Sequence, residues 1–424
     1  MKSEALTIAS NKAVYAPALL VGIVIYFSED TILFGTNSDV GLSTLKYMIY
    51  LVVTLVLLIK INRNILRSHG IYILGVIFVS IISTSLFHLD FSGGYAYQAY
   101  IAFLALLVAQ AIDFRTFADL FRKYMFVLCL LSIVIFTVSN LFDWVLDYFP
   151  TSENTAGIVS TNLFVGSVYM DVAETRNLGI FREPGVFVIY ILFAITIEFF
   201  YRNKVSITVL VCLIATLFTT YSTTAFFTLF VLIVGYFFKG GRKNSHSDRV
   251  IILAITILIV SIFVFQPDTY DQIFSKLNSD SASFESGVAR VASIVVNWEI
   301  FTSSPFVGSG LANYGALFTQ FSRQYFGVPL EAGGQSTNSF MSLFGTYGLV
   351  YGLVVIYAVL RLTKNFTRSF IVQGSIFLAF CLMFSSQDLR YSLLFYMLIF
   401  YGLNYAQNKP CRSSLQTSKS QHGK

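Results

Sequence analysis

Ten residues near the middle of the chain combine charges that suit phosphate chemistry. The stretch reads RNLGIFREPG and contains Arg176, Arg182 and Glu183, with Pro184 leading into an almost wholly apolar run. Proline is tolerated in the first turn of a helix, because its missing N–H has no partner there. The helix N-terminus and the two arginines would together attract an anion such as a diphosphate. A simple ion pair between Arg182 and Glu183 at the membrane surface is the alternative that these residues leave open.

Composition places the chain in a membrane. Of its 424 residues, 56% are hydrophobic and only 12% are charged, whereas a soluble domain carries roughly 25% charged residues. The 43 Phe and 25 Tyr, against two Trp, suit a lipid-facing surface of Phe with Tyr near its edges. The net charge of +6 comes without a dense basic cluster, so we expect no nucleic-acid partner. The spacing of the four cysteines fits no zinc site, and we expect no metal.

Apolar runs long enough to cross a bilayer recur along the whole chain. We predict spans at 13–33, 41–59, 70–87, 95–112, 124–142, 185–201, 205–220, 224–238, 250–267, 338–360, 369–386 and 390–406. The first run resembles a signal peptide but ends without a small-residue cleavage site, so we interpret it as a retained span. The sequence thus predicts an all-α polytopic membrane protein of about twelve helices, forming a single integral membrane domain over residues 1–424.

Loop charge sets the orientation of these spans. With the N-terminus in the cytoplasm, the inside segments hold 21 of the 28 Lys and Arg residues and the outside segments hold the other 7. This bias follows the rule that cytoplasmic loops are rich in Lys and Arg. We therefore expect both termini in the cytoplasm, including a polar tail at 407–424.

Two outside segments are long, at 143–184 and 268–337, whereas the inside loops are short. Loops of this length usually carry function, so we expect the chemistry to face outward.

The second long loop contains a helical pattern. Apolar residues recur at helical spacing from Val288 to Phe301, with Arg290, Ser293 and Asn297 on the other face. This pattern predicts an amphipathic helix at the membrane interface that turns Arg290 toward an aqueous site. An ordinary solvated arginine is the alternative.

Further candidates follow in the same loop. Residues 304–310 read SPFVGSG, a proline stop followed by a glycine turn, where bare backbone at Gly308 and Gly310 could approach a ligand. The next short helix carries Arg323, for which a surface charge is the simpler interpretation. Asn338 would cap the tenth span, and capping explains it without a ligand.

Three stretches together form a recognisable pattern. One reads Arg-x-x-Gly-x-Phe-x-Glu-Pro from Arg176, the next is Arg290 followed by Ser-Pro-Phe-Val-Gly-Ser-Gly, and the third reads STNSFMSLFGTYGL from Ser336. With the many spans and two enlarged outer loops, they resemble the O-antigen polymerase and O-antigen ligase superfamily, the Wzy-type and WaaL-type membrane glycosyltransferases.

The resemblance implies an activity and a location. Such proteins use a sugar chain on undecaprenyl diphosphate as donor, at the periplasmic face of the bacterial inner membrane. Ligases transfer it to lipid A–core, whereas polymerases transfer the growing chain to a new lipid-linked repeat unit. Both look independent of metals and other cofactors. The implied partners are the lipid-linked oligosaccharide, membrane lipid, a chain-length regulator and a flippase.

The resemblance also suggests residue roles. Arg176 and Arg290 match the loop arginines of the family, while Arg182 and Glu183 fall within its first motif. We expect Arg176 and Arg290 to clamp the diphosphate, because preorganised arginines stabilise the charge that develops on the leaving group. Glu183 would activate or orient the acceptor hydroxyl, with Arg182 assisting it and Asp90 as a second candidate base.

One departure from the family pattern favours a polymerase. The ligases have a histidine before the asparagine, where this chain has Thr337, and threonine is no general base near neutral pH. Thr337 joins Asn338, Gly308, Gly310 and Arg323 as the remaining substrate-binding candidates. The product would be O-antigen, capsular polysaccharide or exopolysaccharide. The alternatives are an O-antigen ligase and a flippase for lipid-linked units, although a flippase would want charged residues around a central cavity, and these spans carry none at mid-membrane.

Overall fold

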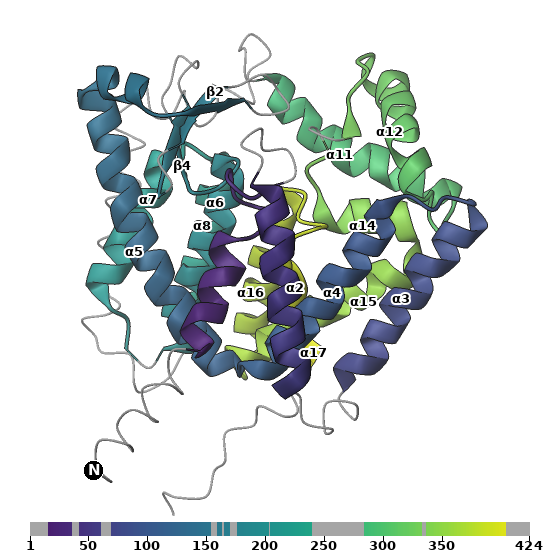
Figure 1. Ribbon diagram of the computed structural model, residues 1–424, viewed down its shortest axis with the longest axis horizontal. Coiled ribbons are helices and arrows are strands. Elements are labelled where there is room, and N and C mark those ends of the chain that lie inside the picture. The colour runs from purple at the N-terminus through teal and green to yellow at the C-terminus, as the bar shows by residue number, and fades with distance from the viewer. Residues whose placement is uncertain are drawn as a thin grey trace, which may run out of the picture.

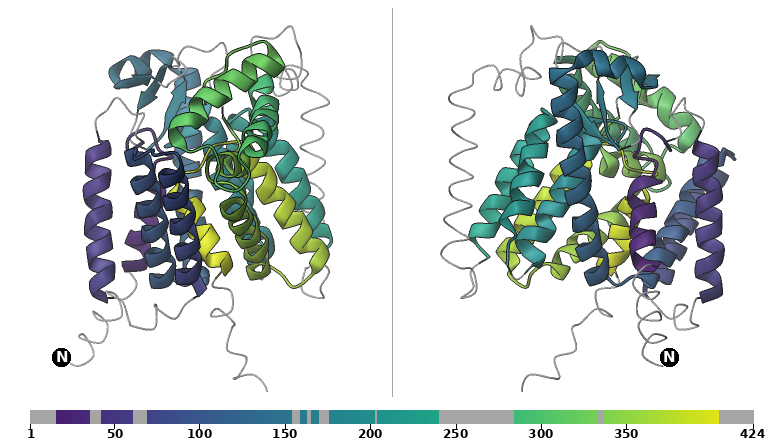
Figure 2. Two further views of the ribbon diagram at one scale, coloured as in Figure 1. Left: turned by 90° about the vertical axis from the view of Figure 1, so that its right-hand side faces the viewer. Right: turned by 60° about the vertical axis from the view of Figure 1, so that its left-hand side comes forward.

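Long helices stand side by side in a bundle, and a small sheet and two further helices cover one end of it (Figure 1; Figure 2). We call this the loop-rich end. The computed structural model describes residues 16–35, 42–60, 69–153, 159–162, 165–169, 176–202, 204–239, 284–332 and 336–403. The bundle helices are Ala16–Tyr26, α2 (Ser43–Lys60), α3 (His69–Phe87), α4 (Gly93–Ala111), α5 (Phe114–Leu141), α6 (Pro184–Thr196), α7 (Ile207–Thr219), α8 (Thr223–Phe237), α14 (Ser339–Tyr347), α15 (Leu349–Leu362), α16 (Phe370–Ser385) and α17 (Leu393–Leu403).

The composition of these helices agrees with a helical membrane protein. Among the described residues, four helices are long and apolar enough to cross a bilayer: His69–Phe87, Gly93–Ala111, Phe114–Leu141 and Pro184–Tyr201. Six shorter apolar helices accompany them. The helix at Pro184–Tyr201 is apolar all round and buried along most of its length, which is typical of a helix at the centre of a bundle. The number of spans stays a prediction.

Most predicted spans coincide with a helix, and the differences have physical causes. The span predicted at 250–267 lies outside the described residues. Helix α5 begins ten residues before the span predicted at 124–142. It begins there because the Asp113 carboxylate accepts hydrogen bonds from the backbone N–H groups of Arg115 and Thr116, a standard N-cap.

The span predicted at 338–360 is two helices, α14 and α15, which are separated at Gly348. This glycine has φ +82°, and a Cβ there would lie 2.3 Å from the carbonyl oxygen of Phe306. The backbone N–H of Leu349 donates to the carbonyl of Pro305 at 2.7 Å. The break therefore exists because the loop after α11 packs into it.

A four-stranded antiparallel sheet forms within the first long loop, which the all-α prediction did not include. Its strands are β1 (Thr151–Glu153), β2 (Val159–Asn162), β3 (Ser167–Tyr169) and β4 (Asn177–Gly179), in the order β1-β2-β3-β4. Strands β3 and β4 lie against α5, and the sheet sits at the loop-rich end (Figure 1). Each strand has only three or four residues, so no run of alternating residues was long enough to indicate it.

The helical pattern in the second long loop is confirmed. It forms α11 (Phe284–Ser303), and α12 (Leu311–Phe326) follows it and is longer than the short helix predicted there. Ser293 and Asn297 are fully buried, whereas Val291 and Trp298 are about half exposed. The buried face of α11 thus contains polar residues together with Val296 and Ile300, which form a small apolar cluster. The face with Val291 and Trp298 is exposed, as suits a helix at a membrane interface.

Buried charge also occurs at the opposite end of the bundle. Glu198, in the π-helical turn Ile197–Tyr201 that extends α6, is fully buried. Its carboxylate lies 3.2 Å from Nη1 of Arg122 and 3.8 Å from Nε of Arg202. This ion pair therefore belongs to the helix ends rather than to the middle of the bundle.

One polar network ties four bundle helices together. Gln98 on α4 donates from Nε2 to the hydroxyls of Tyr351 (3.2 Å) and Tyr396 (2.6 Å), and Tyr347 donates to its Oε1. The Tyr351 and Tyr396 hydroxyls are 2.6 Å apart. All four side chains are fully buried, so each polar atom depends on this network for its hydrogen bond.

Replacing Gln98 with leucine should destabilise the protein, because the three tyrosine hydroxyls would lose partners in an apolar core. We expect a loss of about 2 kcal/mol, seen as a lower midpoint of thermal unfolding in detergent. Gln110→Leu is the matched control on the same helix, since Nε2 of Gln110 is buried without a partner. Its midpoint should stay the same or rise, and an equal loss in both variants would contradict the prediction.

Candidate active site

The stretch from Arg176 runs from the last strand of the sheet into α6. A tight turn follows β4 at Gly179, whose φ is +56° and whose absent Cβ leaves room for the ring of Phe187, 2.8 Å from where that Cβ would be. Glu183 is the N-cap residue of α6 and Pro184 its first residue. The predicted helix start is confirmed, and it lies at the loop-rich end (Figure 1).

The turn between α7 and α8 holds two arginines from different loops. Arg176 donates from Nε and Nη2 to the carbonyl of Thr220 at 3.2 and 3.0 Å, and from Nη2 to the carbonyl of Tyr221 at 2.9 Å. Arg290 on α11 donates from Nη1 to the hydroxyl of Thr224 at 2.7 Å. Carbonyls at the end of a helix attract a cation, so this turn is a natural anchor for Arg176.

Arg176 and Arg290 lie close together, because the residues that bind them, Thr220, Tyr221 and Thr224, are neighbours in the chain. Burial lowers the pKa of Arg290, and the positive charge of Arg176 lowers it further, while the carboxylate of Glu183 acts in the opposite direction. The structure therefore brings Arg176 and Arg290 to the same turn, and the charge of Glu183 acts on Arg290; their catalytic roles stay predictions. We call Arg176, Arg290 and Glu183 the arginine site.

Arg182 has a different environment. Its Nη2 donates to the carbonyl of Asp388 at 2.7 Å, while its Nε is buried without a partner. Burial alone would lower the pKa of Arg182, but the carboxylates of Glu183, Asp30, Asp388 and Glu29 outweigh burial and raise it. Acidic groups thus lie near Arg182, and they would oppose the binding of an added anion there.

Two neighbouring segments escaped the sequence analysis. One is the loop after the first helix, which brings Asp30 to Arg182, and the other is the loop between α16 and α17, which brings Asp388. In the latter loop, Gln387 lies against the first turn of α6. The contact is so close that a Cβ on Gly185 would be 2.3 Å from Nε2 of Gln387. In the sequence, the feature that could have pointed to these two loops is an acidic residue at the end of an apolar run.

Both glycines of the second motif pack against other parts of the protein: Gly308 against backbone and Gly310 against the side chains of Tyr95 and His88. A Cβ on Gly308, whose φ is +70°, would lie 2.2 Å from the carbonyl oxygen of Thr346. Ser309 and Gly310 donate backbone hydrogen bonds to the carbonyls of Gly345 (2.8 Å) and Thr346 (3.1 Å). The close approach at Gly308 is therefore to α14, and packing alone accounts for this glycine.

His88 and Asp90 fasten the start of α12. The Nε2 atom of His88 lies 2.8 Å from the carbonyl oxygen of Gly308. The Asp90 carboxylate accepts from the backbone N–H of Ala312 at 2.9 Å. Because Asp90 caps this helix, Glu183 is the better candidate for a base.

The third motif joins α11 to α14. The hydroxyl oxygen of Ser293 accepts from the backbone N–H groups of Thr337 (2.9 Å) and Asn338 (3.1 Å). The Asn338 side chain accepts from the N–H of Met341 at 3.0 Å, so the predicted cap is confirmed. The Thr337 hydroxyl is buried without a hydrogen-bond partner.

Arg323 lies apart from these groups. It is exposed on the last turn of α12, and it is not among the charges that act on Arg290 or Arg182. The role of Arg323 in substrate binding stays a prediction. The independence of the protein from metals and cofactors also stays a prediction.

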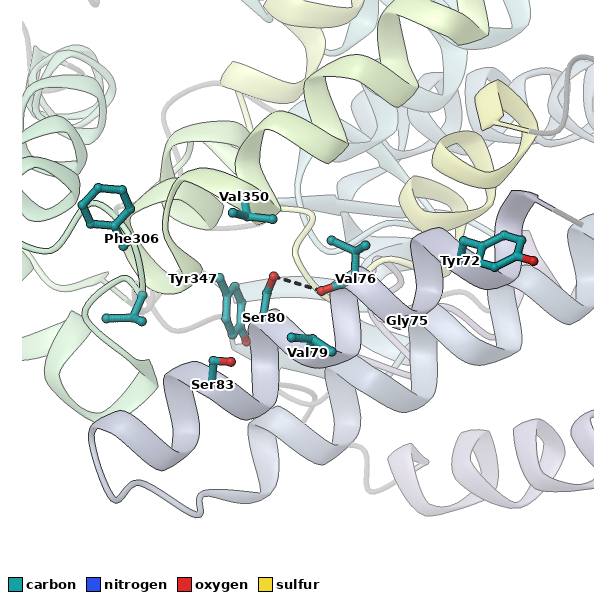
Figure 3. A pocket seen from close by; sticks show the side chains of 10 residues that line it. Tyr72, Gly75, Val76, Val79, Ser80, Ser83, Phe306, Tyr347 and Val350 are labelled. Atoms are coloured by element: carbon teal, nitrogen blue, oxygen red, sulfur yellow. Dashed lines mark hydrogen bonds between the residues drawn. The ribbon is translucent and has the colours of Figure 1, made fainter.

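An apolar cavity lies away from the arginine site. Its volume is about 430 Å³, and it lies between α3 and the junction of α14 with α15 (Figure 3). Tyr72, Gly75, Val76, Val79, Ser80, Ser83, Phe306, Val307, Tyr347 and Val350 line it. The Ser80 hydroxyl turns back to the carbonyl of Val76 at 2.9 Å. No charged side chain lines this cavity, and we assign it no part in binding an anion.

The fold and the site define a helical membrane protein with a cationic centre at one end. Comparison with protein families gives the next step: residues 208–357 match the family model described as O-antigen ligase. The match covers α7 to most of α15, including Arg290 and Asn338, but not the stretch around Arg176. It supports the superfamily of O-antigen ligases and polymerases, whose members are membrane enzymes acting on lipid-linked sugars. No curated protein and no solved structure matches the chain.

Replacing Arg290 with lysine should weaken binding of a prenyl diphosphate. Lysine keeps the charge but lacks the planar fork that suits phosphate oxygens, so we expect roughly a tenfold loss of affinity. Titration calorimetry with farnesyl diphosphate and the protein in detergent would measure it. Arg115→Lys, on the exposed first turn of α5, is the control and should bind normally. Equal affinities for both variants and the wild type would contradict the assignment.

Proposed function

We propose that this protein polymerises undecaprenyl-diphosphate-linked oligosaccharide repeat units into O-antigen, capsular polysaccharide or exopolysaccharide. The observation that carries the proposal is that two like charges, Arg176 and Arg290, are bound by the turn after α7 and the first residues of α8, while the charge of Glu183 acts on Arg290. Like charges repel, and burial makes the repulsion stronger. A dianionic diphosphate between the two arginines would relieve it.

The chemistry follows from these charges. The acceptor hydroxyl attacks the anomeric carbon of the donor sugar, and the bond from that carbon to the diphosphate oxygen breaks. Negative charge grows on the leaving diphosphate, where Arg176 and Arg290 stabilise it. The proton of the hydroxyl passes to Glu183 at the start of α6.

An O-antigen ligase is the second candidate, because the matching family model bears that description. Against it stands Thr337, where the ligases have a histidine. Its hydroxyl is buried without a hydrogen-bond partner, and threonine takes up no proton near neutral pH. We therefore favour the polymerase.

The proposal includes a location and partners. The loop-rich end would face the periplasm from the bacterial inner membrane, with both termini in the cytoplasm. A flippase would deliver the lipid-linked units to that side, and a chain-length regulator would act with the polymerase.

Deleting the protein tests the function directly, and the readout is a gel profile of surface polysaccharide. A polymerase predicts that glycan capped by a single repeat unit remains, because export and ligation continue without it. Full-length polymer stranded on its lipid carrier would show a ligase instead. Lipid-linked units accumulating inside the cell would show a flippase.

Glu183→Gln should abolish long polymer while leaving single-unit capping, because glutamine takes up no proton. General-base contributions are about 10²–10⁴-fold in rate. The control is Glu299→Gln on α11, a carboxylate outside the arginine site, which should give the normal ladder. Normal polymer length in Glu183→Gln would rule out the base role.

A further inference from the structure

The turn between α7 and α8 has an unusual backbone at Tyr221. Its φ is +47°, a left-handed conformation that residues other than glycine seldom adopt. Such a conformation persists only where the surrounding structure enforces it, and it is enriched at functional sites. Here the carbonyl of Tyr221 accepts a hydrogen bond from Nη2 of Arg176 at 2.9 Å. The strained residue therefore belongs to the anchor of one of the two arginines.

Arg176 and Arg290 have different electrostatic relations to this turn. Arg176 binds the carbonyls of Thr220 and Tyr221, at the C-terminal end of α7, where a cation is favoured. Arg290 binds Thr224, the second residue of α8. The first turn of a helix has a partial positive charge that disfavours a cation. The position of Arg290 is thus unfavourable unless a specific contact or an anion compensates it.

The hydroxyl of Thr224 supplies the specific contact. It accepts a hydrogen bond from Nη1 of Arg290 at 2.7 Å, which within the described part of the chain is the one hydrogen bond of the Arg290 side chain. A guanidinium has five N–H donors in a planar fork. The bond from Nη1 therefore restricts the orientation of the group without using Nε and Nη2, a pair of atoms that can bind two phosphate oxygens.

We propose that Thr224 is a positioning residue that orients Arg290 for the diphosphate; this inference rests on the proposed function. Thr224 acts through Arg290, so it needs no contact with the substrate. The N-terminal partial charge of α8 opposes the arginine alone but attracts an anion that is bound beside it. Binding of the diphosphate would therefore offset the unfavourable position of Arg290.

The test is a double-mutant cycle on the binding of farnesyl diphosphate, measured by titration calorimetry with the protein in detergent. Thr224→Val removes the hydroxyl and nearly keeps the shape of the side chain, so the affinity should fall about fivefold. Arg290→Gln should also weaken binding, and adding Thr224→Val to it should change the affinity by less than about twofold. Thr224→Ser retains the hydroxyl and should bind within about twofold of wild type.

Thr228→Val is the matched control, one turn further along the same helix. Among the described residues, the Thr228 hydroxyl is buried without a hydrogen-bond partner. Its removal should therefore leave the affinity unchanged, and the midpoint of thermal unfolding should stay the same or rise. If Thr224→Val does not fold, Thr224→Ala removes the same hydroxyl and takes its place in the cycle.

The outcomes separate the inference from the proposed function. If Arg290→Gln weakens binding and Thr224→Val does not, the inference alone is overturned. The same holds if the losses are additive, if Thr224→Ser binds as weakly as Thr224→Val, or if Thr228→Val lowers the affinity equally. Farnesyl diphosphate that binds wild type and Arg290→Gln with equal affinity, or that does not bind the wild type, would overturn the anion-binding role of Arg290 and with it both proposals.

Discussion

The repulsion between Arg176 and Arg290 is the interaction on which the rest of the site depends. Two guanidinium groups stay close together only if other groups hold each of them. Here the turn between α7 and α8 does so, through the carbonyls of Thr220 and Tyr221 and the hydroxyl of Thr224. The first long loop and α11 must therefore both reach this turn, which explains why they gather at one end of the bundle.

Arg182 has different charged surroundings from Arg290, although both are arginines near the same end of the bundle. The charges that act on Arg290 are one arginine, Arg176, and one carboxylate, Glu183, so Arg290 retains an attraction for an added anion. Arg182 already has acidic groups on several sides, and an anion would gain little from it. Under the proposed function, the number of nearby carboxylates would distinguish the role of Arg290 from that of Arg182.

The sequence allowed good predictions for features that a single segment determines. Apolar runs predicted the helices, the spacing from Val288 to Phe301 predicted α11, and Asn338 was predicted as a cap. The grouping of Arg176, Arg290 and Glu183 could be expected only because the family resemblance joined loops that are distant in the chain. Roles that depend on contacts between distant segments were missed. Asp30 fell within the span predicted at 13–33, and the backbone of Thr346 that lies against Gly308 left no signal in the sequence.

The contacts of Arg182 have a consequence for the order in which the protein is made. Its backbone N–H is bound by the first loop, at Asp30, and its side chain by the last, at Asp388. Synthesis proceeds from the N-terminus, so the ribosome has released nearly the whole chain before this residue acquires both supports. A partly inserted chain therefore lacks one of the two supports of Arg182 until the loop that precedes α17 has been made. The start of α6 thus reaches its final surroundings only near the end of synthesis.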